Sequence, residues 1–130
     1  MSDGRQRLRR VGDGTVICDP LVLGESFRQR FMGLMGRSSL ADGEGLYLPS
    51  NSIHMMFMRF PIDALFVSRV NDQGHRTVVG LRPDLPAWRG LVLPVRGAEG
   101  VVEMPAGTLA RHEVAQGDTI VFEPVTNEQA

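Results

Sequence analysis

The fold is decided by residues 53–68, which read IHMMFMRFPIDALFVS. This stretch holds two apolar runs, Ile53–Met58 and Ile62–Ser68, with few polar residues in either. Runs of this length and composition are typical of strands that are covered on both faces. We therefore expect both runs to be strands in the interior of a β structure.

Glycine and proline divide the rest of the chain into short pieces. Fifteen glycines and eight prolines favour many short strands over long helices. Seven to nine strands are expected in total, and the remaining ones are Thr15–Leu23, Leu46–Leu48, Thr77–Leu81, Leu91–Val95, Gly100–Met104 and Thr119–Phe122. This pattern predicts a mainly β fold, namely a single-domain antiparallel β-sandwich or barrel that is jelly-roll-like.

One short α-helix is expected near residues 26–37. Ser26 and Gln29 have the spacing of a capping box, in which each side chain satisfies the other residue's free backbone N–H group. An apolar stripe follows along one helical face at Phe27, Phe31, Leu34 and Met35. We expect this helix to plug one end of the β structure.

The length of 130 residues suits one domain with one core. Four arginines in residues 5–10 indicate a flexible basic segment over 1–10, formed as a solvated strand or tail, although a basic arm of this kind can also bind nucleic acid or a membrane surface. The predicted β domain then covers 11–124, and the polar residues 125–130 are expected to form a loose tail.

Composition excludes several classes of function. The 14 basic residues are all arginine and face 15 acidic ones, so the net charge of -1 gives no overall attraction for nucleic acid or an acidic membrane. The absence of lysine excludes a Schiff base, and the single cysteine excludes an internal disulfide and a CxxC zinc site. We expect no metal, no cofactor, no nucleic-acid partner and no membrane partner.

The start of the chain bears on its compartment. MSDGRQRLRR runs into a polar turn and lacks the apolar core of a secretory signal. The one unpaired thiol, Cys18, suits a reducing environment, and its neighbour Asp19 would not activate it as a nucleophile. We therefore expect a cytoplasmic protein.

Two acids lie inside apolar strand segments. Asp63 shares a strand face with Leu65 and Val67, so its carboxylate must be paired with Arg59 or Arg30, or bonded by backbone N–H groups. Glu103 occupies a similar position in a later strand. The two acids suggest a carboxylate pair for acid/base hydrolysis, which requires them to flank one cleft.

Other side chains extend the candidate site. His54 lies among methionines that core packing explains better than soft-metal binding. Trp88 stands in a proline-bounded loop, where it is either an exposed stacking platform or a cap on the core. The density of ionisable residues in apolar segments predicts a ligand-binding site formed by Arg30, His54, Arg59, Asp63 and Glu103.

Several strings together resemble a family found in bacteria and archaea, catalogued as domain of unknown function 192. These strings are Arg30–Met35, Gly45-Leu46, His54, Met58–Asp63, Glu103–Thr108 and Gly117-Asp118. The resemblance implies a compact, mainly β domain of sandwich or jelly-roll character with one short helix. It implies no reaction, cofactor or catalytic residue. Many relatives look exported, and this chain departs from them in its N-terminal residues.

Three functions follow as hypotheses. The first is a β domain that binds a small ligand or a protein partner through a polar cluster in an apolar cleft. The second is an acid/base hydrolase that uses Asp63 and Glu103. The third is a purely structural or interaction module, in which the family strings reflect folding constraints.

Overall fold

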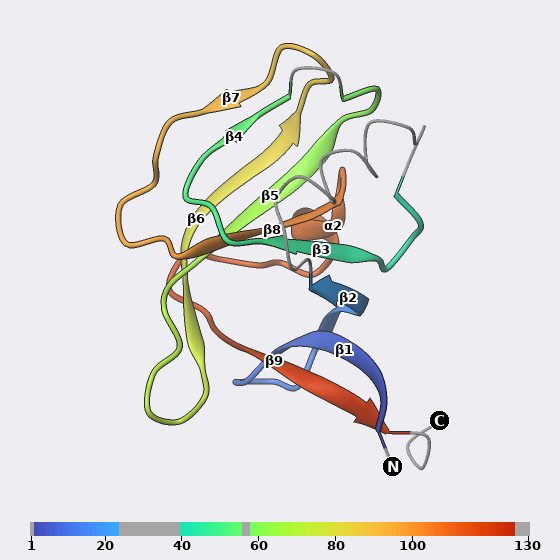
Figure 1. Ribbon diagram of the computed structural model, residues 1–130, viewed down its shortest axis with the longest axis vertical. Coiled ribbons are helices and arrows are strands. Elements are labelled where there is room, and N and C mark those ends of the chain that lie inside the picture. The colour runs from blue at the N-terminus through green and yellow to red at the C-terminus, as the bar shows by residue number, and fades with distance from the viewer. Residues whose placement is uncertain (1, 24–39, 56–57, 127–130) are drawn as a thin grey trace.

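A computed structural model describes residues 2–23, 40–55 and 58–126 (Figure 1). Nine strands and one short helix lie in these ranges, and the helix stands between the last two strands. They are β1 (Ser2–Arg10), β2 (Val16–Leu23), β3 (Gly45–Leu48), β4 (Ile53–His54), β5 (Ile62–Val67), β6 (Arg76–Leu85), β7 (Leu91–Val92), β8 (Gly100–Pro105), α2 (Thr108–Arg111) and β9 (Thr119–Thr126). The mainly β prediction is confirmed, whereas the helix predicted near 26–37 lies outside the described residues. Among the residues that the structure describes, no helix is long and apolar enough to cross a membrane.

Seven of the strands close into a barrel in the order β1, β2, β3, β8, β5, β6, β9 (Figure 1). Neighbouring strands are antiparallel except β2 and β3, which run parallel with Leu21 opposite Gly45. The expectation of a wholly antiparallel sheet is therefore wrong at this one seam. Parallel neighbours need a long connection, and the chain between β2 and β3 provides one in residues 24–44.

The central strands β5 and β8 are covered on both faces, which confirms the prediction for Ile62–Ser68. The same prediction for Ile53–Met58 is wrong, because β4 ends at His54 and the His54 side chain is exposed. Every residue of β5 is buried. Leu65 and Val67 pack inside the barrel, whereas Ile62, Ala64 and Phe66 pack in a second cluster on the outer face of the same strand. We call these two clusters the barrel core and the outer core.

The outer core is covered by a small sheet of β4 and β7, which we call the ribbon. Ile53 pairs with Val92, and both side chains are buried in the outer core. The ladder continues beyond the two strands, because the Met55 N–H donates to the Gly90 carbonyl at 2.8 Å. Their neighbours in the ribbon face the opposite way, since side chains alternate along a strand.

The arginine-rich N-terminal residues form strand β1 rather than the flexible segment predicted. Leu8 is fully buried in the barrel core. The guanidinium groups of Arg7 and Arg9 both pair with the Glu123 carboxylate on β9, at 2.6 and 2.9 Å. These arginines are neutralised on the barrel wall, so their density reflects a strand seam and not a solvated arm. At the other end, β9 extends to Thr126, past the predicted domain boundary at 124.

Candidate functional site

Asp63 on β5 points into the barrel and is 0% exposed. Its Oδ1 accepts the backbone N–H of Asp84 at 2.8 Å, and its Oδ2 accepts the N–H groups of Gly107 at 3.1 Å and Leu109 at 2.9 Å. Three N–H groups therefore satisfy the carboxylate, which was one of the two solutions expected from the sequence. Both carboxylate oxygens bind backbone groups of the fold, so neither is free to bind a substrate.

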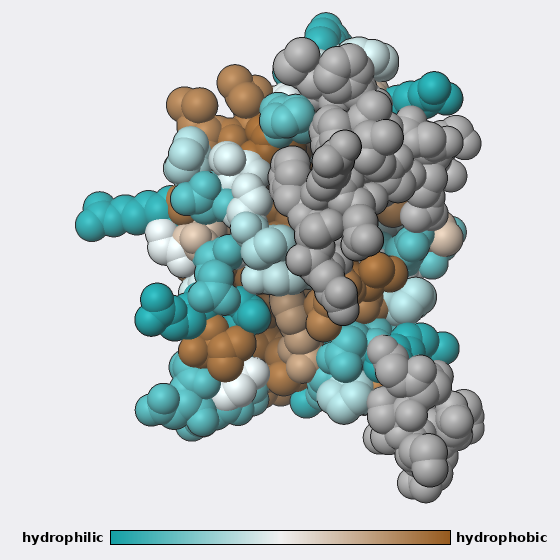
Figure 2. Space-filling view, in the orientation of Figure 1, coloured by the Kyte–Doolittle hydropathy of each residue, from teal (hydrophilic) through white to brown (hydrophobic). Residues whose placement is uncertain are grey.

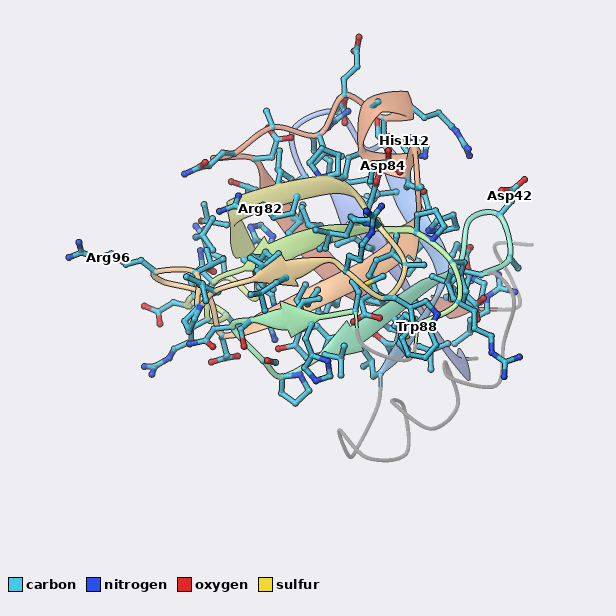
Figure 3. All side chains as sticks on the ribbon, turned by 90° about the horizontal axis from the view of Figure 1, so that it is seen from above. Asp42, Arg82, Asp84, Trp88, Arg96 and His112 are labelled. Carbon is cyan, nitrogen blue, oxygen red and sulfur yellow. The ribbon has the colours of Figure 1, made fainter. Side chains whose placement is uncertain are left out.

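The three backbone groups that donate to Asp63 lie at one end of the barrel. Asp84 and Gly107 have φ angles of 53° and 97°, in the left-handed region that few residues adopt. Asp84 is the next-to-last residue of β6, and Gly107 precedes α2; Figure 3 shows Asp84 beside this helix. One buried carboxylate thus holds two turns that are far apart in the sequence.

The predicted acid pair of Asp63 and Glu103 is wrong. In the β5–β8 ladder, Glu103 lies opposite Ala64 and Met104 lies opposite Asp63. Opposing residues share a face and successive residues alternate, so Glu103 is on the outer-core face while Asp63 is inside the barrel. The sheet separates the two carboxylates, which excludes a hydrolase that uses them across one cleft.

The remaining predicted site residues lie apart from Asp63. His54 and Arg59 are exposed on the surface, Glu103 is buried at 6% exposure, and Arg30 lies outside the described residues. The structure therefore does not gather Asp63 with the other described members of the predicted cluster. In residues 2–23, 40–55 and 58–126, no three His, Cys, Asp or Glu side chains come together as ligands for a metal ion.

Cys18 is a buried free thiol in the barrel core. Burial raises its pKa to about 12, because the thiolate loses its solvation there. Since the thiolate is the reactive form, the expectation that Cys18 is not a nucleophile agrees with its environment.

The outer face of the ribbon presents large apolar side chains to solvent. Leu91 and Leu93 are 66% and 72% exposed, while Val92 between them is buried. Trp88 in the preceding turn is 54% exposed, so the open question about this residue is answered in favour of exposure. Figure 2 shows apolar side chains gathered over β7. We call Trp88, Leu91 and Leu93 the ribbon surface.

The turn before β7 holds Trp88 in a strained backbone conformation. Its φ of 67° is uncommon for a bulky residue and costs about 1–3 kcal/mol. Two backbone hydrogen bonds maintain the turn, from the Gly90 N–H to Pro86 at 3.0 Å and from the Arg89 N–H to Ala87 at 2.8 Å. The fold thus keeps a strained backbone conformation at the position where it exposes an aromatic ring.

Sequence reasoning did not identify Leu91 and Leu93 as site residues. The alternation of Leu91, Val92 and Leu93 places one side chain opposite to the other two, but all three are apolar. The sequence therefore carries no signal for which face is covered. Only the pairing of Ile53 with Val92 decides it.

A cavity of about 370 Å³ lies elsewhere, between β1 and β2. The register of these two strands shifts twice along their pairing. The cavity is lined by Arg5, Gln6, Pro20, Leu21, Val22 and Leu23. The charge of Arg5 is already used by Asp19, whose Oδ1 lies 3.1 Å from its Nε, and none of the predicted site residues reaches this cavity.

Comparisons with solved structures show the same fold. A Sinorhizobium meliloti protein named a "putative transcription regulator" superposes with a TM-score of 0.70 and 23% identity, over 94% of this chain and 96% of that one. A protein of unknown function from Novosphingobium aromaticivorans has a TM-score of 0.69 and 22% identity, over 89% of this chain and 82% of that one.

Comparisons of sequence identify the family. UPF0127 proteins of Thermococcus kodakarensis and Thermococcus sibiricus are 30% and 33% identical, over 82% and 85% of this chain and 67% and 70% of their own lengths. The family DUF192, described as an uncharacterized ACR, matches residues 15–122. The resemblance noted from the family strings is confirmed, and the chain belongs to the DUF192 family.

Proposed function

We propose that this chain is a protein-binding domain and that a segment of a partner protein docks on the ribbon surface. The exposure of Leu91 and Leu93 carries the proposal, because burial of Val92 turns the side chains on both sides of it to solvent, and two large apolar side chains exposed there would gain free energy from being covered. Contiguous exposed apolar side chains mark interaction sites, and tryptophan is prominent in the centres of interfaces. The ribbon surface projects from a sheet, whereas a small molecule needs a concave site. A protein segment is therefore the better fit to this surface.

The test is a selection from a library of random twelve-residue peptides displayed on phage. The bait proteins are the wild type, the double variant Leu91→Ser/Leu93→Ser, and Val70→Ser as the matched control. Val70 is 43% exposed and lies in the β5–β6 connection, outside the ribbon. We expect peptides that bind the wild type and Val70→Ser but not the double variant.

Two results would overturn the proposal. One is a selection that enriches no peptide, and the other is a set of peptides that bind all three baits equally. Either result would favour a structural role for the exposed leucines. Circular dichroism melts of each bait confirm that loss of binding is not loss of the fold.

We also propose a cytoplasmic location, which the free thiol of Cys18 in a chain with one cysteine supports. Cell fractionation with an antibody against the chain tests it. Recovery in the membrane or secreted fraction would contradict it.

A further inference from the structure

We infer that the partner segment is acidic and carries apolar anchors between its acidic residues. This inference rests on the proposed function, because it concerns what docks on the ribbon surface. It comes from a separate observation, the distribution of arginines that have no ion pair.

The described arginines divide into two groups by whether they pair with a carboxylate. Six of them do so, and they are Arg5, Arg7, Arg9, Arg10, Arg69 and Arg76. Five arginines make no ion pair with any residue the structure describes. Arg59 follows β4, and Arg89 and Arg96 lie on the two sides of β7, whereas Arg82 lies on β6 and Arg111 on α2.

The ribbon and the turns beside it therefore carry an excess of positive charge, which the chain as a whole does not. Residues 51–60 and 86–98, which contain β4, β7 and the turns beside them, hold three arginines and no acid, whereas the whole chain has a net charge of -1. Glu99, which follows this range, pairs with Arg69 and Arg76. Arg59, Arg89 and Arg96 are exposed. Figure 3 shows the Arg96 side chain pointing away from the barrel, at the other end of the ribbon from Trp88. An acidic partner is the complement of such a surface.

The arrangement also gives the order of the partner's side chains. Arg89 precedes the exposed leucines and Arg96 follows them. Gly90–Val95 pairs with the β4 side through hydrogen bonds at both ends, from Met55 N–H to Gly90 and from Val95 N–H to Asn51, each 2.8 Å. An extended partner along this stretch would span about seven residues at roughly 3.3 Å each, with acids near both ends and apolar residues between.

Two other occupants fit less well. A second copy of the chain would bring the same unpaired arginines face to face, which is repulsive. An anionic membrane is usually bound by clusters of four to eight basic residues close together, whereas these arginines are spread along the ribbon on both sides of the leucines. Arginine instead suits the two-pronged recognition of a carboxylate.

The experiment uses the peptides that the wild-type chain selects and that require Leu91 and Leu93. We expect Asp or Glu to be enriched on both sides of an apolar centre. Binding of a synthetic selected peptide should weaken about tenfold in Arg89→Glu/Arg96→Glu and fall with added NaCl. Arg111→Glu is the matched control, because Arg111 is exposed and unpaired but lies on α2, and it should leave affinity unchanged. A peptide with its acids replaced by lysine should regain affinity for Arg89→Glu/Arg96→Glu.

The outcomes separate this inference from the proposed function. Peptides that require the leucines but lack acids, or that bind Arg89→Glu/Arg96→Glu as well as the wild type, overturn the acidic partner and leave the protein-binding domain standing. A selection with no peptide overturns both. Wild-type chain that sediments with phosphatidylserine vesicles but selects no peptide assigns the surface to a membrane and likewise overturns both.

Discussion

Two residues in left-handed backbone conformations, Asp84 and Gly107, donate their N–H groups to the same buried oxygen pair of Asp63. The family string Met58–Asp63 and the string Glu103–Thr108 therefore meet through hydrogen bonds of one carboxylate. Such strings invite a catalytic interpretation, since acids in apolar strands are unusual. Here the acid stabilises turn geometry, and one of those turns leads directly into the loop that exposes Trp88.

Removing that carboxylate should be costly. Asp63→Ala leaves three N–H groups at the end of the barrel without their acceptor, and we expect the free energy of unfolding to fall by about 3–5 kcal/mol. Urea denaturation followed by circular dichroism measures the change. Asp63→Asn, which keeps the shape and one acceptor oxygen, should lose less. A midpoint unchanged by Asp63→Ala would show that water replaces the carboxylate without penalty.

Glu113 is a second residue-scale case, with a φ of 51° just after α2. Glycine is the favoured residue where a helix ends in this conformation. Glu113→Gly should raise the free energy of unfolding by about 0.5–1 kcal/mol, because it removes a steric cost that exceeds the extra chain entropy. Glu113→Ala keeps the steric cost, so it should give no gain; equal melting temperatures for the two variants would contradict the argument.

Part of the residue-scale description could be predicted from the sequence. Alternation along Ile62–Ser68 placed Asp63 on a buried face and required partners for it, and both features are observed. The choice between arginine and backbone N–H groups could not be predicted. It depends on where residues 84, 107 and 109 come to lie, which is a property of the tertiary fold.

At the scale of elements, register decides which side chains can act together. Asp63 and Glu103 sit in adjacent, correctly predicted strands, yet a shift of one residue places them on opposite faces. The local sequence does not specify this register, because β6 and β7 lie between the two strands along the chain and no short turn joins them. For the same reason the parallel seam between β2 and β3 was not predicted.

The seam between β1 and β9 should be sensitive to pH. Hydrogen bonds from Arg9 and then Arg7 lower the pKa of Glu123 below its usual 4.5. A carboxylate whose pKa is lowered by folding contributes stability above its unfolded pKa, and that contribution disappears as the pH falls through the folded pKa. Glu123→Gln should therefore destabilise by about 1 kcal/mol at pH 7.

The measurement is urea unfolding of both proteins from pH 7 down to pH 2. We expect the two curves of stability against pH to converge below pH 4.5, where the unfolded-state carboxylate takes up its proton. A constant difference across this range would mean that Glu123 stabilises by packing and not by its charge.

At the scale of the whole molecule, closure depends on the N-terminal strand. β1 pairs with β2 on one side and with β9 on the other, so it is the strand that joins the two edges of the sheet. The sequence predicted a flexible segment because alternating arginines look like a solvated tail. The acid that neutralises Arg7 and Arg9 lies more than 110 positions away along the chain, with separations of 116 and 114, and no local pattern reveals it.

Deletion of residues 1–10 should abolish cooperative unfolding, because it removes Leu8 from the barrel core and leaves two open strand edges. A thermal melt followed by circular dichroism, with dye binding to detect exposed apolar surface, tests this. Arg7→Gln/Arg9→Gln is the control, since it removes the charges and keeps the strand, and it should still melt cooperatively. A sharp melt of the truncated chain would show that β1 is dispensable.

The pairing of β1 with β9 places Ser2 opposite Thr126. A host polypeptide that entered the barrel at one of these residues would leave it at the other, about one strand spacing of 5 Å away. The domain should therefore tolerate insertion into a surface loop of an unrelated protein without forcing the ends of that loop apart. It should also tolerate circular permutation, in which Ser2 and Thr126 are linked and the chain is opened at an exposed hairpin such as Asn71–Gly74.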